Sequence, residues 1–232
     1  MTSKGEFYQR DRSLHPPALT PSYKTSVARS PRYALISLQN SVSEITGPVF
    51  GHNDIDPGDN DLLSNYAQPG ESPIGERIIL HGRVLDENAR PVPNTLVEVW
   101  QANADGNYAH PEGGGPVEEG FRGWGRVITD FDTGEWGFDT VKPGTTRGRN
   151  VGTQAPHLNL WIVARGINIG LNTRMYFDDE AEANAKDPVL NLIEWEHRRA
   201  TLLAKRVEAD GKPVYRFDIK LQGEDETVFF DV

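Results

Sequence analysis

Apolar residues are spaced differently in two parts of the chain. Over residues 1–75 they are scattered without a period, and Pro, Ser, Asn and Asp are frequent. Such a segment has too few periodic apolar positions to fold by itself, so we expect an extended N-terminal arm that packs on the core or on a partner chain. From residue 76 onward, short apolar runs alternate with turn residues, which is the pattern of strands.

The strand-like runs are rich in β-branched and aromatic residues. Eight runs have this character: 77–85, 95–100, 125–129, 135–139, 159–163, 172–176, 214–221 and 227–230. They predict an all-β fold, an antiparallel β-sandwich formed by residues 76–232. Residues 178–207 have helical spacing instead, with Asp178 or Asp179 as the N-cap and a break at Pro188, and predict a short helical insertion near the C-terminus.

Composition limits the chemistry of the chain. None of the 232 residues is cysteine, so disulfides, Cys-ligated metals and a cysteine nucleophile are excluded, and any metal needs His, Tyr, Asp or Glu. A net charge of −10 argues against a nucleic-acid or anionic membrane partner. The polar N-terminus and the lack of any run near the roughly 18 apolar residues of a spanning helix lead us to expect a cytoplasmic protein.

Three positions at predicted strand ends are candidates for function. Tyr108 follows a glycine-containing turn at the sandwich rim, where spacing does not separate a packed tyrosine from a functional one. His157 and Asn159 alternate by two and therefore share one face of a strand, although a lone histidine is often a hydrogen-bonded structural residue. Arg165 stands where an apolar strand enters a loop, and it is either a carboxylate-binding group or half of an ordinary ion pair.

Common catalytic motifs do not occur in the sequence. There is no phosphate-binding Walker loop, no Rossmann glycine fingerprint and no G-x-S-x-G nucleophile elbow. The remaining histidines lack the paired spacing of zinc hydrolases; they are His15, His52, His81, His110 and His197.

Longer runs resemble the protocatechuate 3,4-dioxygenases of the intradiol ring-cleaving family. The beta-like runs, which resemble the iron-bearing subunit, are 11–26, 74–77 and 93–104, the last containing Trp-Gln-Ala-Asn-Ala. The alpha-like runs, which resemble the partner subunit, are 123–126, 133–136, 155–157, 164–168, 176–181 and 226–231. The chain is therefore a mosaic. The resemblance implies associating sandwich subunits that cleave a small aromatic acid, a catechol, with O₂.

The resemblance also implies ferric iron held by two tyrosines and two histidines of the beta chain. Tyr108 and His157 match the first tyrosine and the first histidine, but Thr146 and Asn159 stand at the other two ligand positions, and Gln154 replaces an arginine. Phenolates favour Fe(III), so these losses are expected to weaken ferric binding severely. We therefore expect a degenerate metal site with vestigial Tyr108 and His157, no iron on this chain, and Fe(III) on its partner.

The same resemblance suggests a role for Arg165, because the equivalent alpha-chain arginine lies near the substrate carboxylate in a composite cleft. Thr46, Gly47 and Pro48 match an alpha-chain loop of that cleft, although Val49 stands where alpha chains have a tyrosine. We expect an alpha-type subunit that walls the cleft of a beta-type partner and does no ring cleavage alone.

Two alternatives stay open. In the first, the chain is a non-catalytic scaffold or binding protein that self-associates, since the beta-like and alpha-like halves of the interface now occur in one chain. In the second, the chain is an active homomeric dioxygenase with altered iron ligands, for which Tyr66 and His110 are the only candidate replacements.

Overall fold

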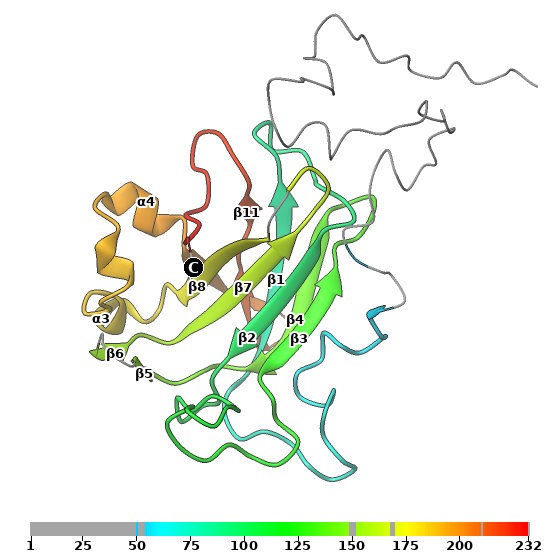
Figure 1. Cartoon of the computed structure of the whole chain (residues 1–232), viewed down its shortest axis with the longest axis vertical. Coiled ribbons are helices and arrows are strands. Elements are labelled where there is room, and N and C mark those ends of the chain that lie inside the picture. Colours follow the sequence, from blue (N-terminus) through cyan, green and yellow to red (C-terminus); the bar gives the residue numbers. More distant parts are fainter. Residues whose placement is uncertain (1–49, 51–53, 149–151, 168–169, 210, 232) are drawn as a thin grey trace, which may run out of the picture. The chain divides into compact units, whose positions relative to one another are not determined.

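The computed structural model describes residue 50 and residues 54–148, 152–167, 170–209 and 211–231. The predicted all-β class is confirmed for these residues, which form many strands and only short helices (Figure 1). Thr46, Gly47, Pro48 and Val49 lie outside the described residues, so the loop they were predicted to form is not tested.

Nine of the described strands form one sheet. They are β1 (Arg77–Leu85), β2 (Leu96–Gln101), β3 (Trp124–Ile128), β4 (Glu135–Val141), β7 (His157–Val163), β8 (Leu171–Phe177), β9 (Leu203–Ala209), β10 (Lys212–Arg216) and β11 (Ile219–Lys220). A separate two-stranded sheet, which the sequence did not predict, consists of β5 (Thr146–Gly148) and β6 (Gly152–Gln154). The main sheet runs β3, β2, β7, β8, β9, β10, β1, with β4 and β11 also paired to β1.

The prediction of an antiparallel sandwich is wrong in one respect, because the sheet is mixed. Strand β1 pairs in parallel with β10 and β11, and β8 pairs in parallel with β9. Parallel neighbours need a long crossover, and the helical insertion between β8 and β9 supplies one. At the other end of the path, β3 and β4 are joined by a tight turn and contact each other, so the sheet closes around a common core.

The helical insertion is confirmed, but it ends earlier than predicted. It comprises α3 (Ala181–Asn184), a 3₁₀ turn η2 (Leu190–Leu192) and α4 (Glu196–Ala200). Residues 203–207 belong to β9 rather than to a helix, because Leu203 and Ala204 pair with Tyr176 and Phe177 of β8. Among the described residues, no helix is long and apolar enough to cross a membrane.

Two predicted strands differ in the structure. The run 214–221 is split, because the carboxylate of Asp218 accepts the backbone N–H of Arg83 at 3.0 Å where a ladder bond would otherwise continue. Both halves, β10 and β11, still pair with β1. Residues 227–230 form no strand and contribute only one bridge, between Phe230 and Asn172.

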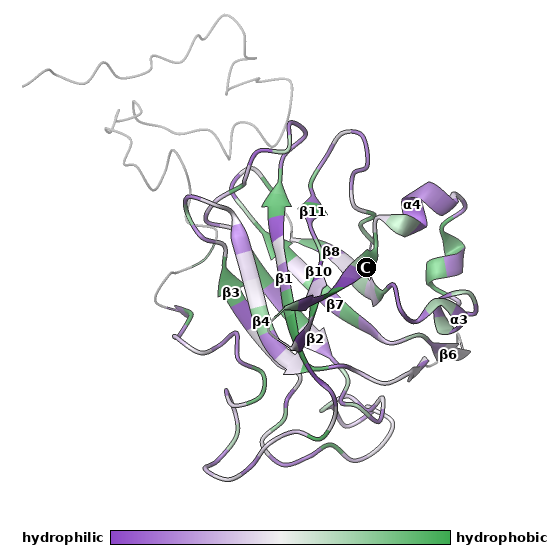
Figure 2. Ribbon diagram, turned by 180° about the vertical axis from the view of Figure 1, so that it is seen from behind, coloured by the Kyte–Doolittle hydropathy of each residue, from purple (hydrophilic) through white to green (hydrophobic). Residues whose placement is uncertain are grey.

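The strand β7 shows how the sheet separates a core face from an outer face. Leu158, Leu160 and Ile162 point into the core and are at most 2% exposed, whereas Asn159 and Trp161 lie on the outer face. Figure 2 shows the same alternation as changes of colour along single strands. Side chains that share the outer face of β7 are therefore available for a site.

The described part of the predicted arm, residues 54–75, packs on the sheet without contributing a helix or strand to it. Leu62 is 1% exposed in the main core, and its backbone N–H donates to the carbonyl of Asp139 at 2.9 Å. Asn65 Nδ2 donates to the carbonyl of Trp124 at 2.9 Å. The boundaries of the arm and of the sandwich domain stay predictions.

Candidate functional site

Tyr108 is presented by a tightly packed turn that follows β2. The side-chain oxygen of Asn103 accepts two backbone N–H groups of this turn. Gly106 adopts φ +82°, and a Cβ there would come within 1.9 Å of the Thr145 carbonyl oxygen, so only glycine fits. The turn thereby lies against the segment leading into β5, and the ring of Tyr108 packs on Trp100 with centroids 4.6 Å apart.

A chain of hydrogen bonds joins Tyr108, His157 and Asn159. His157 Nδ1 is 2.7 Å from the carbonyl of Ala155, which can only accept, so Nδ1 carries the proton and Nε2 is an acceptor. The Tyr108 hydroxyl, 3.2 Å from Nε2, therefore donates to it. Asn159 Nδ2 donates to the Tyr108 oxygen at 3.0 Å and to the Trp100 carbonyl at 3.2 Å, a second acceptor that fixes the amide orientation. Three residues singled out by the sequence thus meet.

Burial and one nearby cation set the protonation of this chain of hydrogen bonds. His157 is 1% exposed, and burial followed by the Arg174 guanidinium lowers its pKa to about 4. Burial raises the pKa of the Tyr108 phenol, although the Asn159 hydrogen bond and the Arg174 charge oppose this change. Both rings are therefore uncharged at neutral pH.

Arg174 of β8 also belongs to the site, although it was not among the residues predicted from the sequence. It lies opposite Asn159 in the β7–β8 pair, and its Nη1 donates to Gln154 Oε1 at 2.6 Å and to the Tyr176 hydroxyl at 3.4 Å. A basic residue in a predicted strand carried no signal by itself. Only the register of the hairpin places Arg174 beside Asn159.

Asp187 supports the site from the helical insertion. This fully buried carboxylate accepts the backbone N–H of Ala155 at 2.7 Å and the hydroxyl of Tyr176 at 3.2 Å. Ala155 in turn holds His157 through its carbonyl. In the sequence this position is visible only as a break in the predicted helix, which carries no signal of a link between the insertion and the histidine.

Thr146, the residue at the second tyrosine position, lies in β5 opposite Gln154. It is 2% exposed, and its Oγ1 has no hydrogen-bond partner within the described part of the chain. The threonine therefore adds no group to the hydrogen-bond chain.

The donor set does not fit ferric iron as it is arranged. The Tyr108 proton is donated to His157 Nε2, the atom that would bind a metal, and the Tyr108 oxygen accepts an amide N–H from Asn159. The phenol is neutral, whereas Fe(III) favours anionic oxygen ligands. Within the described ranges, no group of three or more His, Asp or Glu residues could hold a metal ion.

Arg165 does not belong to this site within the chain. It is exposed in the turn that follows the last residue of β7, whereas His157 is the first residue of that strand. A strand of this length spans about 20 Å. The structure therefore separates the predicted carboxylate-binding residue from the Tyr108–His157 pair.

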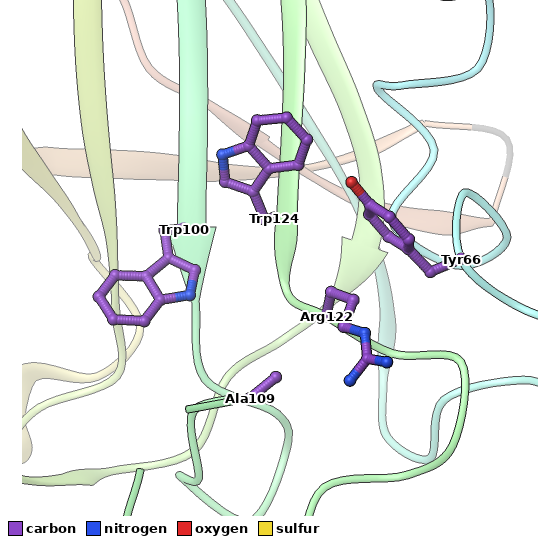
Figure 3. A pocket seen from close by; sticks show the side chains of 5 residues that line it. All are labelled: Tyr66, Trp100, Ala109, Arg122 and Trp124. Atoms are coloured by element: carbon purple, nitrogen blue, oxygen red, sulfur yellow. The ribbon is translucent and has the colours of Figure 1, made fainter. Parts of the chain in front are cut away.

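An open pocket of about 540 Å³ lies beside Trp100 (Figure 3). It is lined by Tyr66, Trp100, Ala109, Arg122 and Trp124. Trp100 and Trp124 are opposite each other in the β2–β3 pair. The exposed Arg122 side chain forms no ion pair with another described residue.

Tyr66 and His110, the two candidate replacement iron ligands, lie beside Trp124 and Trp100. The ring of Tyr66 is 6.4 Å from that of Trp124, and the ring of His110 is 6.4 Å from that of Trp100. In the described structure, neither side chain forms a hydrogen bond with Tyr108 or His157.

Two family models match the sequence. The model described as "Dioxygenase" matches residues 45–223, and the model described as "Protocatechuate 3,4-dioxygenase beta subunit N terminal" matches residues 8–41. The chain belongs to the intradiol dioxygenase family. The separate match of the N-terminal segment to a beta-subunit model confirms the predicted resemblance of this part of the chain.

Relatives of both subunit types are similar to this member of the family. The protocatechuate 3,4-dioxygenase alpha chain of Pseudomonas putida is 53% identical over 173 residues, 75% of this chain and 84% of the relative. The alpha chain of Burkholderia cepacia is 42% identical over 85% of this chain and 100% of its own length. The beta chain of Burkholderia cepacia is 38% identical over 94% of both chains.

Solved structures support the fold. The 3-chlorocatechol 1,2-dioxygenase of Rhodococcus opacus 1CP aligns with a TM-score of 0.54 at 19% identity, over 86% of this chain and 76% of that chain. The dioxygenase domain of a carbohydrate-binding fusion protein from Streptomyces sp. SirexAA-E aligns with a TM-score of 0.51 at 22% identity, over 76% of this chain and 94% of that chain.

Proposed function

We propose that this chain is the alpha-type subunit of a protocatechuate 3,4-dioxygenase. In this proposal it binds an iron-bearing beta-type chain and walls the cleft in which O₂ cleaves a catechol acid. The observation that carries the proposal is the uncharged series of hydrogen bonds through Asn159, Tyr108 and His157. In it the two remaining ligand atoms, the Tyr108 oxygen and His157 Nε2, are bonded to each other rather than free to bind a metal. The 53% identity to an alpha chain supports the same assignment.

The position of Arg165 supports a composite cleft rather than a site within one chain. Its side chain is exposed at the end of β7, where a second chain can approach it. A guanidinium binds a carboxylate through two parallel hydrogen bonds, so Arg165 would hold the acid group of the substrate and orient its ring. Thr46, Gly47 and Pro48 are proposed for the same wall. Fe(III) belongs to the partner chain in this proposal.

Co-expression with a beta-type chain tests the proposal. We expect the two chains to purify together and to oxidise protocatechuate, while this chain alone is colourless, free of iron and inactive. In the complex, Arg165→Ala should cost about 2 kcal/mol or more of substrate binding, a rise in KM of roughly 30-fold. Arg90→Ala, at another exposed arginine, is the matched control. Stoichiometric iron with a phenolate-to-iron absorption band in the lone chain, or an unchanged KM for Arg165→Ala, would contradict the proposal.

A second candidate function is that of a non-catalytic binding protein, which the pocket in Figure 3 favours. Aromatic faces stack on planar rings, and Arg122, which forms no ion pair among the described residues, supplies a cation for an acid group beside Trp100 and Trp124. In this reading the chain binds an aromatic acid without iron and self-associates. Benzoate should then quench tryptophan fluorescence in the native chain but not in Arg122→Gln, and light scattering should show a stable homo-oligomer. Absence of both effects would exclude this function.

A further inference from the structure

The site around Tyr108 contains a fixed positive charge. The guanidinium of Arg174 is held beside both rings: Arg174 lies opposite Asn159, which donates to the Tyr108 oxygen, and it donates to the hydroxyl of Tyr176, whose ring is 5.7 Å from that of His157. Its position is held by Gln154 Oε1 at 2.6 Å and the Tyr176 hydroxyl at 3.4 Å. Both partners are neutral, and in the described structure no carboxylate lies within ion-pair distance of Arg174.

This charge is permanent, because a guanidinium is not deprotonated in proteins. The nearest acid connected to it is Asp187, which reaches Arg174 only through the Tyr176 hydroxyl and is already engaged by three backbone N–H groups. A cation placed between the Tyr108 oxygen and His157 Nε2 would meet the field of Arg174 in surroundings of low dielectric constant.

We propose that Arg174 is the residue that excludes metal cations from the Tyr108–His157 site, its guanidinium standing in for the charge of an ion. Thr146 and Asn159 supply no iron ligands. The two ligand atoms that remain, the Tyr108 oxygen and His157 Nε2, are 3.2 Å apart, a spacing that adjacent ligands of one ion can have. The missing ligands and the positive charge of Arg174 therefore oppose metal binding separately.

These two effects predict different metal affinities when one missing ligand is restored. Asn159 already reaches the Tyr108 oxygen at 3.0 Å, so Asn159→His brings a second imidazole to the same face of β7, two residues from His157. With Tyr108 this makes three ligands of the types that transition metals accept. If missing ligands were the only obstacle, this single change would produce a tight site.

The experiment compares three variants of the full-length chain: Asn159→His, Asn159→His with Arg174→Gln, and Asn159→His with Arg174→Lys. Co²⁺ alone is titrated by calorimetry and by its visible absorption. Glutamine keeps an N–H group for Gln154 without the charge, whereas lysine keeps the charge. We expect the glutamine variant to bind Co²⁺ at least tenfold more tightly than the other two.

Equal affinity with and without Arg174, tight binding by the lysine variant, or no binding in any variant would overturn the proposal. Near-ultraviolet circular dichroism checks that each variant is folded, and Arg174→Met in the same background replaces the glutamine variant if that one does not fold. The titration uses the lone chain and needs no beta-type partner. Its failure would therefore leave the proposed alpha-type function to be decided by co-expression.

Discussion

Replacement of Asp187 by alanine should strongly destabilise the fold, because this carboxylate connects the helical insertion to the site strand. It accepts four hydrogen bonds, from the backbone N–H groups of Ala155, Val189 and Leu190 at 2.7–2.8 Å and from the Tyr176 hydroxyl at 3.2 Å. The donors of Ala155, Leu190 and Tyr176 are buried, and each unpaired buried donor costs about 1–3 kcal/mol. Relief of the desolvated charge offsets part of the sum, which leaves a net loss of about 3–5 kcal/mol.

Urea unfolding of the native chain and the variant, followed by circular dichroism, measures this loss. A protein of this size has a stability of about 5–15 kcal/mol, so the expected change is a large fraction of the total and moves the midpoint by more than about 1 M urea. Asp132→Ala, at an exposed turn carboxylate with no side-chain hydrogen bond in the described structure, is the matched control and should change the midpoint little. A loss below 1 kcal/mol for Asp187→Ala would refute the reasoning that this side chain holds Ala155 and Tyr176 in place.

Three further predictions concern the turn and the hydrogen-bond chain. Because the pKa of His157 is lowered to about 4, the unfolded imidazole takes up its proton first, so stability should be full above about pH 6.5 and fall by about 3 kcal/mol toward pH 4. His157→Gln has no imidazole, so the free energy of unfolding of this variant should not show this fall. If the native chain and the variant lost the same stability toward pH 4, the ring would not be buried as described. Tyr108→Phe leaves the His157 acceptor unpaired and removes one of the two acceptors of Asn159 Nδ2, so it should cost about 1–2 kcal/mol in the same urea assay; no change would argue against the hydrogen-bond chain. Gly106→Ala should lower the melting temperature far more than Gly211→Ala, since both have positive φ but only Gly106 faces a backbone oxygen at 1.9 Å; equal shifts would contradict the close packing of the turn.

Much of the strand pattern was predictable because it depends on local spacing. The alternation in β7 predicted that His157 and Asn159 share a face, and both side chains do contact Tyr108. The turn before Tyr108 was likewise visible as polar residues around Gly106. These features are local because one strand and one turn contain all of their determinants.

Pairing between distant strands was not predictable in the same way. The parallel neighbours of β1 and β8 depend on where the chain returns after long connections, and that choice is made by burial of the whole core. The run 203–207 had helical spacing, but pairing of Leu203 and Ala204 with β8 decided its conformation. Tertiary contacts here outweighed a weak local preference.

The sequence by itself determined the family and the all-β class, because these follow from long similar runs and from strand periodicity. The resemblance alone implied that Tyr108 and His157 belong to one site, and their hydrogen bond is seen in the structure. Only the tertiary structure decided what surrounds that pair. Arg174 reaches it through the register of the β7–β8 hairpin, and Asp187 through the return of the helical insertion onto β8. Neither residue is near His157 in sequence, and long-range packing alone places a guanidinium and a buried carboxylate around two neutral rings.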